Sequence, residues 1–262
     1  MTGSLSSLFS LEKKTALVTG GAQGMGRMIA SGLISAGAKV YITSRKADIC
    51  AATARELSEL GTCVGIAADL NTPEAVVALA DEIKKREPQL HIMINNAGRT
   101  WGAPLESFPD KAWPSVMAVN VQGPFTLVRE LLPLLKAGAT REDPARVINI
   151  GSLAGLRAEP LSAYSYAASK AAIHHLSRVL ARDLADKHIT VNSVIPGYFP
   201  TQMTAHIRGQ DAELTKLLER VPLGRLGEPD DIVGACLYLS SRAGRYVTAA
   251  ELVVDGGMAG CG

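Results

Sequence analysis

The sequence has little of several features that would mark particular classes of protein. Its four cysteines are scattered over 262 residues without a CxxC pair, which argues against a disulfide framework or a zinc site. We therefore expect buried, reduced thiols. No run approaches the roughly 20 apolar residues that a membrane span needs. The opening residues, MTGSLSSLFSLEKK, lack a basic start and a long apolar segment, so we expect no secretory signal and a cytoplasmic protein.

An excess of charge of one sign is also missing. The 27 basic and 25 acidic residues give a formal net charge of +2 and are mixed throughout the chain. This balance gives no electrostatic reason to expect a nucleic-acid or membrane partner. No metal site is expected either. His174 and His175 would point about 100° apart on a helix, so we predict helix-surface or interface packing for both.

What the sequence does contain is an alternation of short apolar runs with segments of helical spacing. The runs are mostly apolar at consecutive positions, as expected for strands that are covered on both faces. We predict strands at 15–19, 39–43, 63–67, 91–94, 146–150, 190–194 and 251–254. We predict helices at about 24–36, 48–60, 74–86, 111–136, 162–186 and 229–241. This pattern predicts the α/β class, with a parallel sheet and helices on both faces.

No repeat or linker divides the chain, so we expect a single domain over residues 1–262. The segment from about 198 to 228 breaks the alternation of strands and helices. It follows the sixth predicted strand, at the sheet edge where α/β proteins bind ligands. We interpret it as a substrate-loop insertion, with a simple long loop as the alternative.

A glycine-rich turn joins the first predicted strand to the first helix, in ALVTGGAQGMGRMIASGL. Gly20 allows a sharp exit from the strand, Gly24 lets the backbone approach a pyrophosphate, and Gly26 permits close packing. The start of the helix then offers unpaired N–H groups and a positive dipole end to an anion. The turn therefore predicts a dinucleotide site.

The end of the second predicted strand indicates which dinucleotide binds. An acidic residue there would accept hydrogen bonds from a ribose 2′-hydroxyl and repel a 2′-phosphate. The sequence instead reads YITSRKAD, with Ser44 at that place and Arg45 and Lys46 after it. Because a guanidinium matches a phosphate, NADP(H) is favoured over NAD(H). Asp69, in AADLN, is expected near the adenine and at a turn.

The stretch YSYAASK contains a tyrosine and a lysine that can meet. Tyr166 and Lys170 are four residues apart and share one helix face, whereas Tyr164 lies about 240° around from Lys170. An ammonium about 5 Å away, at an effective dielectric near 20, is worth roughly 3 kcal/mol, or about 2 pKa units. We therefore expect Lys170 to lower the pKa of Tyr166 towards the range of a general acid–base group. Ser152, after the strand VINIG, could hydrogen-bond a substrate carbonyl.

These features occur in an order that resembles the short-chain dehydrogenase/reductase family over essentially the whole chain. The motifs are TGxxxGxG at 19–26, NNAG at 95–98, VNVQGPF at 119–125, Ser152, Tyr166-x-x-x-Lys170, PGYFPT at 196–201 and DGG at 255–257. The resemblance implies a Rossmann-type, doubly wound sheet of seven parallel strands that holds a nicotinamide dinucleotide. It implies that Tyr166 transfers the proton, that Lys170 lowers its pKa and binds the ribose, and that Ser152 orients the carbonyl. It also implies that Asn120 anchors a water that relays protons.

The motifs and the resemblance together assign a larger set of residues to the cofactor. These are Gly20, Gln23, Gly24, Met25, Gly26, Ser44, Arg45, Lys46, Asp69, Leu70, Asn96, Ala97, Gly98, Tyr166, Lys170, Pro196, Gly197 and Thr201. The loop 196–201 is expected to cover the nicotinamide. Gln23 departs from the basic residue common in NADP-dependent members, which leaves Arg45 and Lys46 to carry the preference. Family members are often tetramers, so a homotetramer or homodimer is expected.

The function predicted from this reasoning is NADP(H)-dependent reduction of a β-ketoacyl thioester or another hydrophobic ketone. Stretches such as TWGAPLESFP and DPARVINIGS resemble the β-ketoacyl reductases of the family. One alternative is an NAD-dependent secondary-alcohol or steroid dehydrogenase, and another is a non-catalytic NADP-binding regulator. Several apolar residues could line a substrate pocket or simply pack in the core and lid. They are Trp101, Leu153, Leu156, Leu161, Tyr198, Phe199 and Met203.

Overall fold

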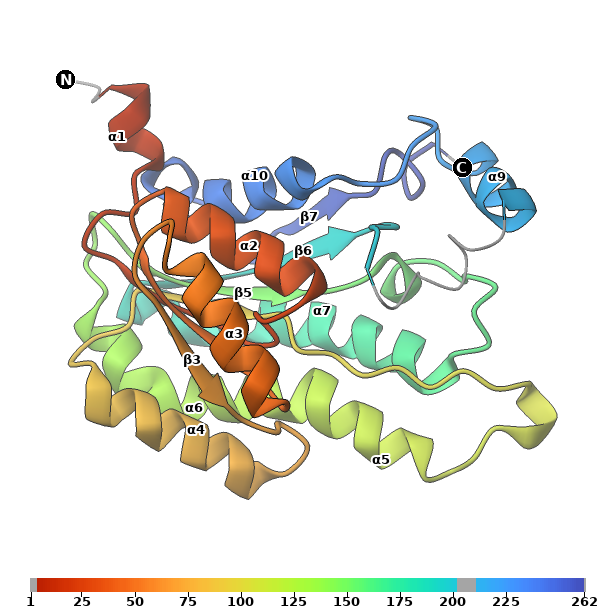
Figure 1. The fold of residues 1–262 in the computed structure, drawn as a ribbon, viewed down its shortest axis with the longest axis horizontal. Helices are drawn as coiled ribbons and strands as arrows, with labels where there is room; N and C mark the ends of the chain where they lie inside the picture. Colours follow the sequence, from red (N-terminus) through yellow and green to blue (C-terminus); the bar gives the residue numbers. More distant parts are fainter. Residues whose placement is uncertain (1–3, 202–210, 262) are drawn as a thin grey trace.

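The computed structural model describes residues 4–201 and 211–261, and its centre is one parallel sheet (Figure 1). Over these residues the sheet has seven strands in the order β3-β2-β1-β4-β5-β6-β7. They are β1 (Thr15–Val18), β2 (Lys39–Ser44), β3 (Cys63–Ala67), β4 (Ile92–Asn95), β5 (Ala145–Ile150), β6 (Ile189–Pro196) and β7 (Glu251–Val254). The predicted Rossmann-type, doubly wound fold is confirmed, and each strand lies within two residues of its prediction.

The burial of the strands explains why their sequences read as continuous apolar runs. Every residue of β1, β4, β5 and β6 is buried, because these central strands are covered on both faces. The strands at the two edges differ. In β3 only Cys63 is buried, with half-buried and exposed residues alternating after it, and β7 is half-buried except for the exposed Val253.

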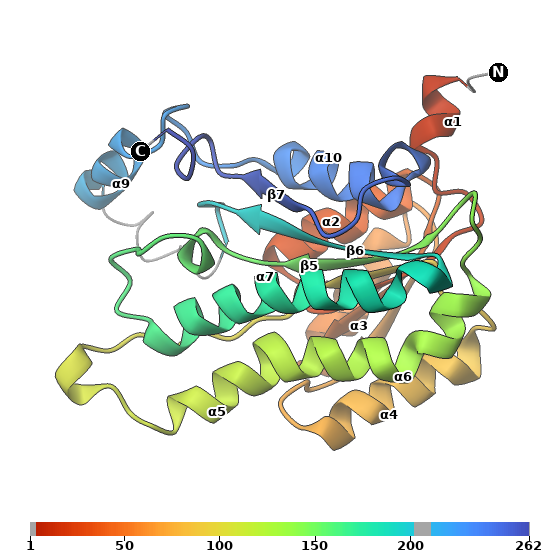
Figure 2. The same cartoon turned by 180° about the vertical axis from the view of Figure 1, so that it is seen from behind.

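Helices cover both faces of the sheet (Figures 1 and 2). One face packs against α2 (Gly24–Ser35), α3 (Ala47–Leu57) and α10 (Pro229–Ser240), which contribute to one apolar core. The other face packs against α4 (Pro73–Arg86), α6 (Gly123–Ala137) and α7 (Tyr164–Leu184), which contribute to a second core. The remaining helices are α1 (Leu5–Phe9), α5 (Ala112–Met117) and α9 (Asp211–Glu219), with short 3-10 turns at Leu105–Ser107, Leu153–Gly155, Ala185–Lys187 and Arg242–Gly244.

The helix predicted over 111–136 is interrupted. A π-helical turn, Ala118–Gln122, lies between α5 and α6 and contains Asn120. Pro124 has no N–H to donate to the carbonyl of Asn120, four residues earlier. The N–H of Gly123 instead bonds to the carbonyl of Ala118, five residues earlier. The widened turn is the π-bulge geometry often found at functional sites.

The segment predicted as an insertion is described only in part. Residues 202–210, including Met203, lie outside the described residues, and α9 follows them. The single domain stays a prediction, supported by one sheet whose described strands come from both ends of the chain, from Thr15 to Val254. No helix in the described part of the chain is long and apolar enough to span a bilayer.

Candidate active site

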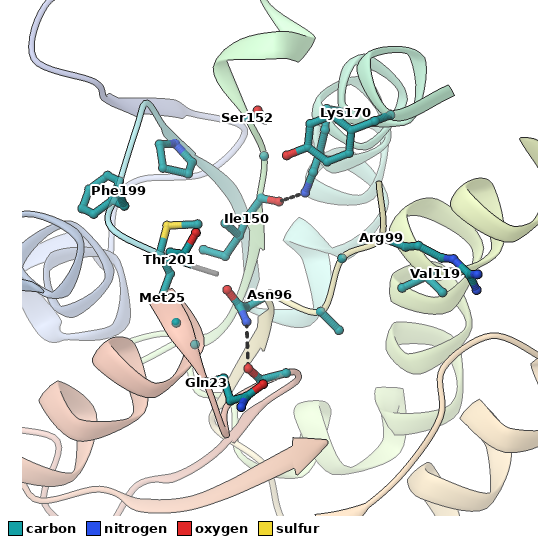
Figure 3. Close-up of a pocket in the computed structure, with 18 of the residues that line it drawn as sticks. Gln23, Met25, Asn96, Arg99, Val119, Ile150, Ser152, Lys170, Phe199 and Thr201 are labelled. Carbon is teal, nitrogen blue, oxygen red and sulfur yellow. Dashed lines mark hydrogen bonds between the residues drawn. The ribbon is translucent and has the colours of Figure 1, made fainter. Parts of the chain in front are cut away.

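A cavity opens at the carboxyl ends of β1, β2, β4, β5 and β6 (Figure 3). The cavity lies between the neighbouring strands β1 and β4, whose following helices cover opposite faces of the sheet. This is the usual position of a ligand in doubly wound folds. Ser152 lines it, as do all the predicted cofactor residues except Lys46. Asn120 does not line it. The structure thus brings residues as far apart in the sequence as Gly20 and Thr201 to one edge of the sheet.

The glycine-rich turn has the backbone geometry that the sequence predicts. Gly20 and Gly24 have φ values of +64° and +54°, which side-chain-bearing residues rarely adopt. A Cβ at Gly26 would lie 2.3 Å from the carbonyl oxygen of Gly20, so only glycine permits this packing. At Gly24 the nearest atom to such a Cβ is in Thr201, 3.5 Å away, because that position faces the cavity. The side chain of Gln23, the residue that precedes α2, makes no capping hydrogen bond.

Thr19 is a site residue that the sequence analysis missed. Its hydroxyl oxygen accepts hydrogen bonds from the N–H groups of Asn96 and Ala97, each at 3.0 Å. The side-chain amide of Asn96 donates in return to the carbonyls of Thr19 and Gly20, at 2.9 and 3.2 Å. These bonds join the turn after β1 to the turn after β4. A threonine that directly follows a buried strand was the available signal.

The end of β2 forms the cationic part of the cavity. Arg45 is exposed and lines the cavity, whereas Lys46 is exposed but lies outside the lining. The hydroxyl of Ser44 accepts a hydrogen bond from the N–H of Lys46 at 3.3 Å, which fixes the turn. Within residues 4–201 and 211–261, no acidic side chain forms an ion pair with Arg45. Asp69 accepts a hydrogen bond from the N–H of Asn71 at 3.1 Å, so the predicted turn is confirmed.

Tyr166, Lys170 and Ser152 meet in this cavity. Tyr166 and Lys170 are 9% and 5% exposed, and both come from the first two turns of α7. The ammonium of Lys170 lies 5.6 Å from the centre of the Tyr166 ring. It donates a hydrogen bond to the carbonyl of Ile150 at 2.7 Å (Figure 3). The hydroxyl of Ser152 favours the ionised form of the neighbouring Tyr166 phenol and so acts to lower its pKa.

The electrostatics of this group correct one prediction. Burial raises the pKa of Tyr166 above its ordinary value, and only the hydrogen bond from Ser152 opposes the increase. Burial also lowers the pKa of Lys170 to about 8. The prediction that Lys170 lowers the pKa of Tyr166 is therefore wrong, because the pKa is raised and Lys170 does not offset the effect of burial. Removal from water disfavours both the phenolate and the ammonium.

Asn120 supports the site from outside the cavity. Its side-chain oxygen accepts the N–H of Arg99 at 2.8 Å, and its amide donates to the carbonyl of Arg99 at 2.9 Å. The same amide donates to the hydroxyl of Ser169 at 2.9 Å, and Ser169 donates to the carbonyl of Tyr166 at 2.7 Å. Asn120 thus ties the cavity-lining segment at Arg99 to the start of α7. The sequence analysis missed Ser169 and Arg99 in this arrangement.

The apolar candidates for a substrate pocket divide into two groups. Leu153, Leu161, Tyr198 and Phe199 line the cavity, whereas Trp101 and Leu156 are not part of its lining. The lining therefore combines apolar side chains with the hydroxyls of the site.

Glu159 is a further lining residue that the sequence analysis missed, and its side chain is only 2% exposed. It accepts hydrogen bonds from the hydroxyl of Tyr198 at 3.0 Å and from Arg220 at 2.8 Å. Its second oxygen lies 3.1 Å from Nε of Arg157. Burial and the neighbouring Glu159 carboxylate raise the pKa of Tyr198 to about 12. A single carboxylate thus joins the loop before α7, the loop after β6 and the end of α9.

The prediction of helix-surface packing is confirmed for His175 and is wrong for His174. His175 is exposed, as predicted for the helix surface. His174 is 3% exposed, and its Nε2 accepts a hydrogen bond from the N–H of Ser152 at 3.3 Å. Burial and the positive charge of Lys170 lower its pKa to about 4, so its ring is neutral. His174 therefore belongs to the interior of the site, not to the helix surface.

Comparisons with known proteins agree with this geometry. Residues 20–259 match the protein-family model described as enoyl-(acyl carrier protein) reductase. The rhamnolipids biosynthesis 3-oxoacyl-[acyl-carrier-protein] reductase of Pseudomonas aeruginosa is 46% identical over 249 residues, which cover 95% of this chain and 97% of that protein. The solved Pseudomonas aeruginosa RhlG/NADP active-site complex has a TM-score of 0.94 at 45% identity, covering 97% and 99% of the two chains. Galactitol 2-dehydrogenase (L-tagatose-forming) of Cereibacter sphaeroides is 37% identical over 253 residues, 95% of this chain and 96% of that protein.

Proposed function

Since the chain belongs to the short-chain dehydrogenase/reductase family, we propose that it is an NADP(H)-dependent oxidoreductase that reduces the carbonyl of a β-ketoacyl thioester or another hydrophobic ketone. One observation carries this proposal. Ser152, Tyr166 and Lys170 meet in the same cavity as a glycine-rich turn that leaves room for a dinucleotide. The predicted family resemblance is confirmed by the matches over nearly the whole chain.

The cofactor residues fit a dinucleotide phosphate on structural grounds. At Gly24 a Cβ would meet only the side chain of Thr201, at an ordinary contact distance, and the side chain of Gln23 does not cap α2. The start of α2 can therefore receive a pyrophosphate. Arg45, which lines the cavity beside Ser44, would hold the 2′-phosphate. NADPH, when bound, supplies the hydride.

Tyr166 is the proton donor of the proposed reduction. Its raised pKa keeps the phenol protonated at neutral pH, which a donor to a carbonyl oxygen requires. Ser152 donates a hydrogen bond to the same oxygen and stabilises the charge that develops there. Lys170, when charged, stabilises the phenolate that remains after the proton has left. Asn120 takes the water-relay role that the family implies, supported by its position beside Ser169 and Arg99.

The proposed substrate class is supported by the apolar lining of the cavity and by the similarity to the Pseudomonas aeruginosa reductase. Leu153, Leu161 and Phe199 offer contacts for an acyl chain or a hydrophobic ketone. The similar Pseudomonas aeruginosa protein is described as a 3-oxoacyl-[acyl-carrier-protein] reductase. A polyol would gain nothing from these apolar side chains, and any hydroxyl placed against them would lose its hydrogen bonds to water, at a cost in binding free energy.

The test is a panel of substrates followed by the absorbance of NADPH. It contains 3-oxoacyl thioesters on acyl carrier protein and on a short thiol, simple hydrophobic ketones, and galactitol with NADP⁺ or NAD⁺. We expect NADPH oxidation with the 3-oxoacyl thioesters or the ketones. Turnover of galactitol alone would favour a polyol dehydrogenase, which the 37% identical relative makes a reasonable second candidate. Cofactor binding without any turnover would favour a non-catalytic regulator.

We also propose a cytoplasmic location and a homotetramer or homodimer. The four cysteines are all free, and three of them are buried, as is usual where thiols stay reduced. Trp113, Phe125 and Val179, on α5, α6 and α7, are each at least 40% exposed and offer apolar surface for a second copy. Light scattering on the purified protein would give the molecular mass of the assembly and would contradict this proposal if it found a monomer.

A further inference from the structure

His174 lies on the same face of α7 as Tyr166 and Lys170. Tyr166, Lys170 and His174 follow each other at intervals of four residues, so all three project from the same side of the helix. All three are buried. His175, the adjacent residue, points to solvent. The imidazole of His174 therefore lies one helical turn beyond Lys170, next to the turn that carries Ser152.

The imidazole contacts the backbone of the turn that presents Ser152. Its Nε2 accepts the N–H of Ser152 at 3.3 Å, which requires the ring proton to be on Nδ1. Two glycines let the chain approach the ring this closely. A Cβ at Gly151 would lie 2.2 Å from Nε2, and one at Gly155 would lie 2.8 Å from Cε1. The turn between β5 and α7 is therefore shaped around this ring.

Ser152 is consequently held from two sides. Its hydroxyl accepts the N–H of Ala154 at 3.2 Å, and both Ser152 and Tyr166 line the cavity. Its backbone N–H is held by His174. Without the second contact, the N–H of Ser152 would lose its acceptor in a partly buried environment, and the turn would be less restrained beside Tyr166.

We propose that His174 is a positioning residue, which fixes the hydroxyl of Ser152 for the reaction by accepting the N–H of Ser152. This inference rests on the proposed function, in which Ser152 orients the carbonyl. The alternative is a packing role, in which only the shape of the ring matters. Burying a polar ring costs free energy relative to an apolar side chain, so packing alone gives no reason for a histidine here.

A matched pair of variants separates these two roles. In His174→Gln the side-chain oxygen can reach the place of Nε2 and accept the N–H of Ser152. In His174→Met a side chain of similar length fills the space without a strong acceptor. We expect kcat to fall about tenfold in His174→Met and by less than about threefold in His174→Gln, with the KM for NADPH unchanged in both. The controls are His175→Gln and His175→Met, which should match the wild type.

A second readout does not depend on turnover. Hydrogen exchange of the peptide that covers residues 151–156 should be faster in His174→Met than in the wild type, and close to wild type in His174→Gln. Equal kcat in His174→Met and the wild type, or equal losses in Met and Gln, would overturn the positioning role. Exchange that is unchanged in His174→Met would also overturn it. If the wild type turns over no substrate, the proposed function fails, and the exchange rates still decide whether His174 holds Ser152.

Discussion

At the scale of single residues, Lys170 is the site residue whose shifted pKa lies nearest to neutral pH. Burial lowers its pKa to about 8, whereas burial raises the pKa of Tyr166. As the pH rises through about 8, Lys170 loses the charge that stabilises a developing phenolate, while Tyr166 keeps its proton. We therefore predict that kcat for ketone reduction is level below about pH 8 and falls above it.

The pH profile of kcat, measured at saturating NADPH and ketone, checks this prediction. Lys170→Arg is the informative comparison, because a guanidinium stays charged at every pH of the assay. The decline near pH 8 should be absent from its profile, whatever its absolute rate. A wild-type profile without a decline, or the same decline in Lys170→Arg, would assign the ionisation to another group.

Arg45 carries the second residue-scale prediction, which concerns cofactor choice. The change Arg45→Asp removes the guanidinium from the cavity and adds a carboxylate that repels a 2′-phosphate and accepts a ribose hydroxyl. We expect the KM for NADPH to rise at least about tenfold and the KM for NADH to fall. Arg55→Asp, an exposed change on α3 outside the cavity lining, is the control. Unaltered NADPH kinetics in Arg45→Asp would refute the phosphate assignment.

Residue-scale prediction succeeded where local geometry decides the outcome. Helical spacing was enough to bring Tyr166 and Lys170 to one face, and the glycine pattern was enough to predict the sharp exit at Gly20 and the close packing at Gly26. The direction in which the pKa of Tyr166 shifts could not be predicted from helical spacing, because the shift depends on how far the fold removes the phenol from water. The burial of His174 likewise depends on a turn 20 residues away.

At the scale of elements, Glu159 links three segments around the cavity. The loop before α7, the loop after β6 and the end of α9 meet at its buried carboxylate. In Glu159→Ala, Tyr198 loses its acceptor and two arginines lose their counter-charge. Because both guanidinium groups are partly exposed, we expect a loss of only about 1–2 kcal/mol in the free energy of unfolding, together with a larger change in KM for the ketone than in kcat.

Denaturant unfolding and steady-state kinetics measure the two effects. Tyr198→Phe removes one of the hydrogen bonds and should cost about 1 kcal/mol. Glu56→Ala breaks an exposed ion pair with Arg27 and is the control, with an expected effect of less than about 1 kcal/mol on stability. A KM for the ketone that stays at its wild-type value in Glu159→Ala would show that this junction does not shape the substrate pocket.

Element-scale prediction also had a physical limit. The periodicity located each strand and most helices, since burial on one or both faces dictates the apolar pattern. It predicted one helix over 111–136, where the structure has a π-helical turn before α6. Proline alone does not reveal the turn, because Pro124 accompanies the break whereas Pro133 lies inside α6.

At the scale of the whole molecule, two buried histidines predict how stability depends on pH. Burial lowers the pKa of both His91 and His174 to about 4, below the ordinary value of 6.5. The unfolded chain therefore binds protons more readily than the folded one in this range, and stability falls as the pH falls from about 6.5 to about 4. A pKa difference of this size corresponds to roughly 3 kcal/mol for each histidine.

The midpoint of thermal unfolding, measured across this pH range, tests whether stability falls as the pH falls. We expect a steady decrease from about pH 6.5 downwards in the wild type. In His174→Gln, which has no titrating ring at that position, the decrease should be smaller, while the exposed His175→Gln should behave like the wild type. A midpoint that stays constant down to about pH 4.5 would contradict the burial of these two rings in a neutral form.

The architecture of the whole molecule was the part that the sequence predicted best. Alternating strands and helices with right-handed crossovers leave few possible sheets, and the observed order puts the cavity between β1 and β4. The hydrogen bonds that join the two turns there, from Asn96 and Ala97 to Thr19, depend on side-chain positions that no pattern of hydrophobicity specifies.

The proton donated by Tyr166 is the central claim, and one comparison tests it most directly. Wild-type protein and Tyr166→Phe are assayed for NADPH-dependent reduction of the best substrate of the panel, and their NADPH affinities are measured by fluorescence titration. We predict a fall in kcat of about 10²- to 10⁴-fold with an unchanged affinity for NADPH. Reduction by Tyr166→Phe at the wild-type rate would contradict the account.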